Sequence, residues 1–122
     1  MKWKNSFTGL LAAAIISLPT AVAAQSAEVE AKVSFDEGKS LFAKGEYTAA
    51  AERFREAYRI NPSWKLLYNI GQAEASAKRY GLALEAFESY LLEGGDELSP
   101  GRQEEIIKET TRLRAFVGML DI

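Results

Sequence analysis

Five pairs of identical residues in this chain are separated by the same distance, 33 positions. The pairs are Gly38 and Gly71, Tyr47 and Tyr80, Ala50 and Ala83, Glu52 and Glu85, and Phe54 and Phe87. Self-similarity at a period of this size is typical of helical pairs stacked side by side. The offset therefore predicts an all-α fold, an α-α superhelix of about two antiparallel helix-turn-helix repeats.

The local pattern agrees with this prediction. Strong helix formers dominate from Glu28 to Leu92, and apolar residues recur at spacings of three and four positions. Glycine, proline and capping residues divide this segment into four helices. Gly45 is expected to end the first helix, and Asn61 and Pro62 the second. Ser63 is expected to cap a third helix that begins at Trp64, and the fourth helix is expected to begin near Tyr80.

The paired glycines predict how the helices pack. Gly38 and Gly71 lie inside helices, where glycine costs roughly 1 kcal/mol relative to alanine. A second helix that crosses closely over each glycine would offset this cost, with Ala50 or Ala83 at the crossing and an aromatic ring filling the gap. A generic helical bundle with the same residues in its core is the alternative.

These residues resemble the tetratricopeptide repeat family. The resemblance implies two units, residues 31–63 and 64–95, of which the second departs from the family pattern at Tyr90 and Gly95. It also implies a concave surface, made by the first helix of each unit, that binds a peptide or a partner protein. The residues that carry the repeat packing are Gly38, Tyr47, Ala50, Phe54, Ala57, Pro62, Gly71, Tyr80, Ala83 and Phe87.

The resemblance also suggests which residues face that surface. Lysines beside aromatic residues there could hold an acidic or C-terminal peptide. The family's carboxylate clamp is matched only at Asn69, so binding of chaperone tails is not expected. A solvated helix face with packed aromatics is the alternative. The groove-facing candidates are Lys32, Phe35, Lys39, Phe42, Lys65, Tyr68, Asn69, Gln72 and Ser76.

The first 24 residues are typical of a secretory signal peptide. Lys2 and Lys4 precede an uncharged apolar run, residues 7–18, and small residues near Ala24 follow Pro19. Cleavage after Ala24 would leave 98 residues with a net charge of −4, which fits a bacterial periplasm. An uncleaved membrane anchor is the alternative, although the run is short for a span of ~20 apolar residues.

Composition narrows the possible chemistry. The chain has no histidine and no cysteine, so imidazole bases, thiol nucleophiles and zinc sites built from these residues are excluded. We therefore expect no enzyme activity, cofactor or metal, and a net charge of −2 gives no reason to expect nucleic acid. Glu93, Asp96 and Glu97 could bind calcium weakly, but a solvated acidic loop is the preferred interpretation.

The C-terminal part is expected to cap the repeats. Residues 96–117 are interpreted as a loop and an amphipathic helix starting at Ser99–Pro100, with Ile106, Thr110, Leu113 and Val117 on one stripe. Gly118 is expected to end this helix, leaving an extended tail at 118–122. That ending weakly resembles the lead-in to a PEGA-type β domain. Such an ending is expected if the chain is a truncated relative of proteins with that domain, or the N-terminal part of a longer envelope protein.

Together, these features predict a non-enzymatic periplasmic scaffold that binds another protein. A structural subunit that self-associates by repeat stacking is the alternative.

Overall fold

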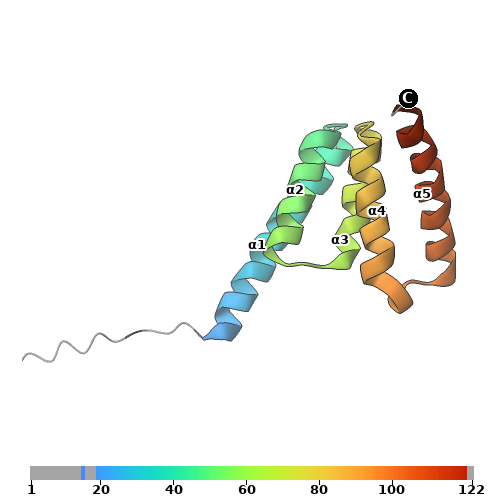
Figure 1. The fold of residues 1–122 in the computed structure, drawn as a ribbon. Coiled ribbons are helices and arrows are strands. Elements are labelled where there is room, and N and C mark those ends of the chain that lie inside the picture. Colours follow the sequence, from blue (N-terminus) through green and yellow to red (C-terminus); the bar gives the residue numbers. More distant parts are fainter. Residues whose placement is uncertain (1–14, 16–18, 121–122) are drawn as a thin grey trace, which may run out of the picture.

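The computed structural model describes residues 15 and 19–120. Within this part of the chain there are five α-helices, one short 3₁₀ helix and no strand. The elements are α1 (Thr20–Ala43), α2 (Tyr47–Ile60), α3 (Trp64–Ser76), α4 (Tyr80–Gly94), η1 (Gly95–Glu97) and α5 (Pro100–Leu120) (Figure 1).

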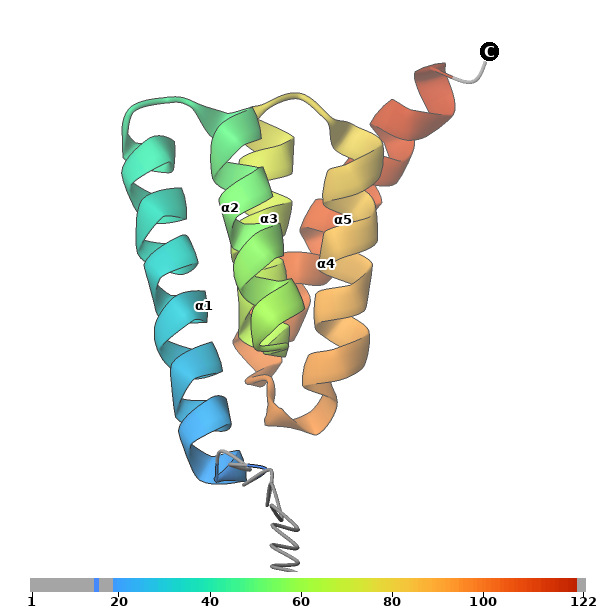
Figure 2. The same cartoon turned by 90° about the vertical axis from the view of Figure 1, so that its left-hand side faces the viewer.

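The helices form two antiparallel pairs followed by a fifth helix. α1 packs against α2 and α3 packs against α4, while α2 also contacts α3 across the two pairs. α5 packs against α4 as α3 packs against α2 (Figure 2). The all-α repeat architecture expected from the 33-residue offset is therefore confirmed.

Each paired glycine lies under a phenylalanine ring of the following helix. A Cβ atom added at Gly38 would lie 2.6 Å from Cδ1 of Phe54, and one added at Gly71 would lie 2.6 Å from Cε1 of Phe87. Carbon atoms in good contact are about 3.5–4.0 Å apart, so no side chain fits there without moving the ring. The close approach predicted from the sequence is made by the aromatic ring.

Small and aliphatic residues fill the rest of the core. Ala50, Ala57 and Ala83 are completely buried, as Leu113 is, and Ile106 is almost so. Because Ile106 and Leu113 of α5 belong to the same apolar cluster as α2, α3 and α4, the fifth helix covers the open side of the second pair.

The turn inside each pair uses a left-handed residue at equivalent positions. Gly45 has φ = 79° between α1 and α2, and Lys78, 33 positions later, has φ = 62° between α3 and α4. Glycine adopts this conformation without strain, whereas a residue with a Cβ does so at a cost of about 1–2 kcal/mol. The second turn thus repeats the geometry of the first without its glycine.

Two sequence predictions about helix ends were wrong. α1 begins at Thr20 rather than Glu28, because alanine-rich residues extend the helix at its N-terminal end. Ser63 is the N-cap residue of α3 as expected, although its side chain makes no capping hydrogen bond. α5 continues through Gly118 to Leu120, so 118–120 are not an extended tail; a single glycine weakens a helix without necessarily ending it. Residues 121–122 lie outside the described part.

Most of the expected signal peptide also lies outside the described residues. Its last part, residues 20–24, belongs to α1 and is exposed. The first buried residue of α1 is Ala31. Of the helices that the structure describes, none has the length and apolar character needed to cross a membrane.

Candidate functional site

Three adjoining cavities lie along one face of α1, α3 and α5. The first, about 310 Å³, and the second, about 130 Å³, lie between α1 and α3 and share Asn69. The third, about 390 Å³, reaches α5 and shares Phe42 and Gln72 with the second. Because neighbouring cavities share walls, they form one continuous depression, called here the α1–α3–α5 groove.

All nine groove-facing candidates from the sequence line this groove. Lys32, Phe35 and Lys65 line the first cavity, Lys39 lines the second, and Tyr68 and Ser76 line the third; the remaining three are the shared Asn69, Phe42 and Gln72. The structure thus brings them together on one surface. It does not test whether that surface binds a partner, which stays a prediction.

The two phenylalanines of α1 have a double role. The ring of Phe35 lies 5.6 Å from that of Phe54, and the ring of Phe42 lies 5.0 Å from that of Tyr47. Both are half-buried, so each packs on its own pair and exposes an edge to the groove. Both rings therefore pack within the first pair and also line the groove, and their contact with a partner stays a prediction.

The lysines at the α1 side surround a single carboxylate. Nζ of Lys32 lies 2.6 Å from Oδ2 of Asp36, and Nζ of Lys39 lies 2.8 Å from Oδ1. Hydrogen bonds from these two lysines lower the pKa of Asp36 to about 2. Lys65 has no carboxylate within 4 Å in residues 19–120; its Nζ lies 5.8 Å from the ring of Trp64. This end of the groove therefore has more ammonium groups than carboxylates to pair with them.

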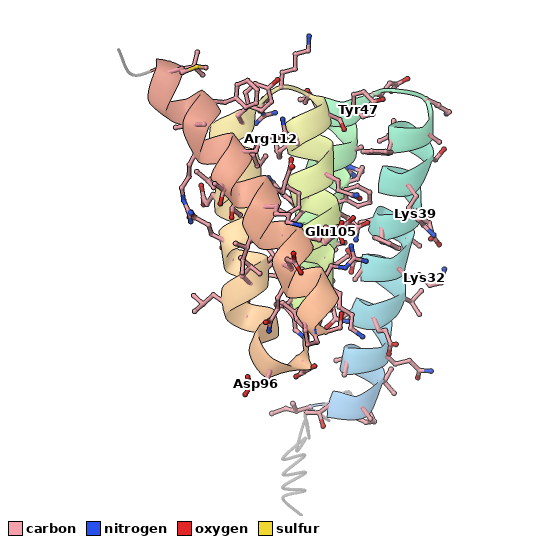
Figure 3. The ribbon with its side chains drawn as sticks, turned by 90° about the vertical axis from the view of Figure 1, so that its right-hand side faces the viewer. Lys32, Lys39, Tyr47, Asp96, Glu105 and Arg112 are labelled. Atoms are coloured by element: carbon pink, nitrogen blue, oxygen red, sulfur yellow. The ribbon has the colours of Figure 1, made fainter. Side chains whose placement is uncertain are left out.

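The α5 side of the groove was missed by the sequence interpretation, which gave this helix only a capping role. Glu105, Glu109 and Arg112 line the third cavity together with buried Ile106. Figure 3 shows Glu105 and Arg112 on α5. They follow one another at helical spacing along α5. Aligning α5 with α1 and α3, as the first helix of an incomplete third repeat, would have placed them in the groove.

Two arginines and two glutamates of α5 are paired within the helix. Arg102 donates to Glu105 at 2.9 Å, and Nε of Arg112 donates to Glu109 at 3.0 Å. Arg102 also lies over the ring of Tyr68, 4.6 Å from its centroid, which connects α5 to α3 across the groove. The α5 wall thus presents neutralised ion pairs above an apolar floor.

Two amide side chains stand at the boundaries between the cavities. Nδ2 of Asn69 donates to the carbonyl oxygen of Lys65 at 3.4 Å, and Nε2 of Gln72 donates to the hydroxyl of Tyr68 at 2.7 Å. These bonds use the amide nitrogens. In the described part of the chain the two amide oxygens accept no hydrogen bond and are available to a ligand.

A buried carboxylate on α3 also escaped the sequence interpretation. The side chain of Glu74 is 1% exposed, and it lies 3.4 Å from Nη2 of Arg55 and 3.0 Å from Nε of Arg79. These pairs join α2 to α3 and to the turn before α4. In the first repeat the equivalent position is Leu41, so Glu74 replaces an apolar contact by an ionic one and has a structural role.

The acidic residues 93–97 are largely exposed in the structure. Glu93 accepts a hydrogen bond from the Tyr58 hydroxyl at 2.8 Å, and exposed Asp96 projects from the loop end (Figure 3). In residues 15 and 19–120 no group of three or more acidic residues is placed to hold a metal ion. The calcium alternative thus gains no support.

The repeated antiparallel pairs, their glycine–phenylalanine contacts and the groove along their first helices define an α-helical repeat protein. A model of the tetratricopeptide repeat family matches residues 35–102, which are more than half of the chain, and the chain belongs to this family. No curated protein and no solved structure gives a significant match. Tetratricopeptide repeats generally mediate protein–protein interaction.

Proposed function

We propose that this chain is a non-catalytic scaffold of the bacterial periplasm that binds a segment of a partner protein in the α1–α3–α5 groove. One observation carries the proposal: three cavities with shared walls line up along the first helix of each pair and α5. The two larger ones, about 310 and 390 Å³, have the size of ordinary ligand sites.

The structure is compatible with removal of the signal peptide. Residues 20–24 of α1 are exposed, and the core begins at Ala31. Of the residues that the structure describes, cleavage after Ala24 would therefore remove none that is buried. Cell fractionation with N-terminal sequencing tests this part: a periplasmic chain that starts at Gln25 is expected, and uncleaved protein in the cytosol would contradict it.

Comparison of the two repeats favours groove binding over self-association by stacking. On α3, Ile70 and Ala73 are buried. The equivalent residues of α1, 33 positions earlier, are Glu37 and Ser40, and both are exposed. Glu37 also pairs with Arg53 at 3.7 Å. At these two positions the outer face of the first pair is polar, as expected for a terminal repeat that meets water, although Val29 and Val33 earlier in α1 are also exposed.

Site-specific photo-crosslinking in living cells tests the groove. A photoreactive phenylalanine analogue at Gln72 is expected to give a defined adduct with a partner protein. The same analogue at Glu52, which is exposed on α2 and lines none of the three cavities, is the matched control. Adducts from position 52 alone, or an adduct with the mass of two copies of this chain, would contradict groove binding.

A further inference from the structure

We propose that one end of the molecule docks on the anionic headgroups of a lipid bilayer and inserts the side chains of Met119 and Leu120 among the lipids. α1, α3 and α5 run in the same direction, so the α1–α2 turn, the α3–α4 turn and the C-terminal end of α5 lie at one end, called here the turn end (Figures 1 and 2). The proposal concerns this end alone and is independent of binding in the α1–α3–α5 groove.

α5 carries exposed apolar side chains at the turn end. Its last buried residue is Leu113, and beyond it Phe116 is 36%, Met119 61% and Leu120 76% exposed. The ring of Phe116 stacks on that of Tyr80 at a centroid distance of 5.0 Å, which fastens this part of α5 to the start of α4. Phe116, Met119 and Leu120, called here the apolar tip, are therefore held at a defined place on the molecule.

The turn end also has a surplus of positive charge. Lys44 and Lys78 are exposed in the two turns, and neither has a carboxylate within 4 Å in the described residues. Arg79 pairs with buried Glu74 at 3.0 Å, and the one acidic residue of the two turns is Glu46. The arginines near the end of α5 are paired with carboxylates, Arg112 with Glu109 and Arg114 with Glu88. Two lysines are thus set against a single unpaired glutamate.

The opposite end of the molecule is acidic. Figure 3 shows Asp96 at the end opposite to Tyr47, the first residue of α2. Of the charged residues described at this end, one lysine and five acidic residues have no oppositely charged group within 4 Å: Lys65, Glu28, Glu30, Glu93, Asp96 and Glu97. A negatively charged surface therefore attracts the turn end and repels the other one, which orients the molecule with its apolar tip toward that surface.

A few apolar side chains beside unpaired lysines fit a bilayer better than a protein surface. A stable protein interface buries about 800 Å² on each partner, which three side chains at the end of one helix do not supply. A bilayer requires less, because apolar side chains insert among the lipids while lysines contact the headgroups. Since neither contribution is strong alone, binding is expected to be reversible and to require both.

Vesicle flotation tests the docking. The probe is the chain that starts at Gln25, which lacks the apolar run 7–18 that would itself insert, and which keeps every buried residue that the structure describes. The vesicles are made of phosphatidylcholine alone, or of equal parts phosphatidylcholine and phosphatidylglycerol. We expect binding to the anionic vesicles at low salt, weaker binding at high salt, and at least about tenfold weaker binding to the neutral vesicles.

Two matched pairs of variants connect vesicle binding to the turn end. Leu120→Ser is expected to weaken binding about fivefold to tenfold, whereas Leu92→Ser, which removes an equally exposed leucine near the opposite end, should change it less than twofold. Lys44→Gln is expected to weaken binding to anionic vesicles about fivefold, and Lys65→Gln less than twofold. Changing Met119 as well as Leu120 to serine should abolish binding. Circular dichroism verifies that each variant is folded.

The outcomes separate this docking from groove binding. No binding to anionic vesicles, equal binding to both kinds of vesicle, or equal effects within either matched pair would overturn the proposal. A dimer in light scattering that Leu120→Ser dissociates would also overturn it, because the apolar tip would then be an interface between two copies of this chain. Loss of the adduct at position 72 with vesicle binding intact contradicts the proposed function alone, and the reverse result contradicts only the docking of the turn end.

Discussion

Replacing Gly71 with alanine tests the packing that sets the distance between α3 and α4. The added Cβ would lie 2.6, 2.7 and 2.8 Å from Cε1, Cδ1 and Cζ of Phe87. These distances are about 1 Å shorter than a good carbon–carbon contact. The ring is 3% exposed and all three contacts are shorter than 3.0 Å, so the ring or α4 must shift.

The expected decrease in the free energy of unfolding is the difference between two opposing effects. Overpacking of this kind costs about 1–3 kcal/mol, whereas alanine is better than glycine in a helix by about 1 kcal/mol. We therefore expect Gly71→Ala to lower the free energy of unfolding by about 1 kcal/mol, which lowers Tm by about 4–8 °C in a domain of this size. Urea denaturation followed by circular dichroism measures it. Gly71→Leu should lose several times as much.

A double-mutant cycle with Phe87→Leu isolates the contact. In this background the smaller side chain leaves room for the Cβ, so Gly71→Ala should be neutral or stabilising, with a coupling energy of at least about 1 kcal/mol. Gly81→Ala is the control, since a Cβ there meets no atom within 4 Å, and it should stabilise the protein by up to about 1 kcal/mol. Our reasoning is refuted if Gly71→Ala behaves like Gly81→Ala, or if its cost is unchanged without the Phe87 ring.

Three further substitutions test the turn, the buried carboxylate and the groove. Lys78→Gly should raise Tm, because it removes about 1–2 kcal/mol of strain at φ = 62° and loses about 1 kcal/mol or less in chain entropy; a lower Tm would show that Lys78 is not strained. Glu74→Leu places in the second repeat the residue found at Leu41 and should change the free energy of unfolding by no more than about 1 kcal/mol, or increase it. A loss above about 3 kcal/mol in urea denaturation would contradict this. Asp36 should titrate near pH 2 in an NMR experiment, against an ordinary pKa of 3.8, and Lys39→Met should raise its pKa. Because the folded-state pKa is lowered, the stabilisation by Asp36 is complete above about pH 4 and is lost as the pH falls toward 2.

Much of the fold could be predicted because the repeat places the same residue types at the same structural positions. Gly38 and Gly71 lie at close helix contacts in the structure, as predicted, but the atoms that they meet belong to Phe54 and Phe87, whereas the sequence interpretation had placed Ala50 and Ala83 at these crossings. All nine groove candidates could be predicted for a similar reason, since side chains at helical spacing on the first helix of each pair must face the same way.

The α5 wall of the groove could not be predicted from local pattern. Glu105 and Arg112 have the spacing of an ordinary solvated helix face, and only the packing of α5 on α4 turns that face toward α3. The helix limits at Thr20 and Leu120 were missed because alanine-rich sequence and a lone glycine do not specify where a helix ends.

The sequence by itself determined the repeat, its length and the close helix approach at the paired glycines, because these depend on residues whose spacing along the chain repeats. The tertiary structure decided the rest. It placed Lys78 in the left-handed turn that Gly45 occupies in the first unit, since closing the second pair requires that geometry whatever the residue. Lys32 and Lys39 both pair with Asp36, whereas Lys65 has no carboxylate within 4 Å in the described part of the chain. Only the tertiary structure decides this, because ion pairs form between side chains that lie close together in space.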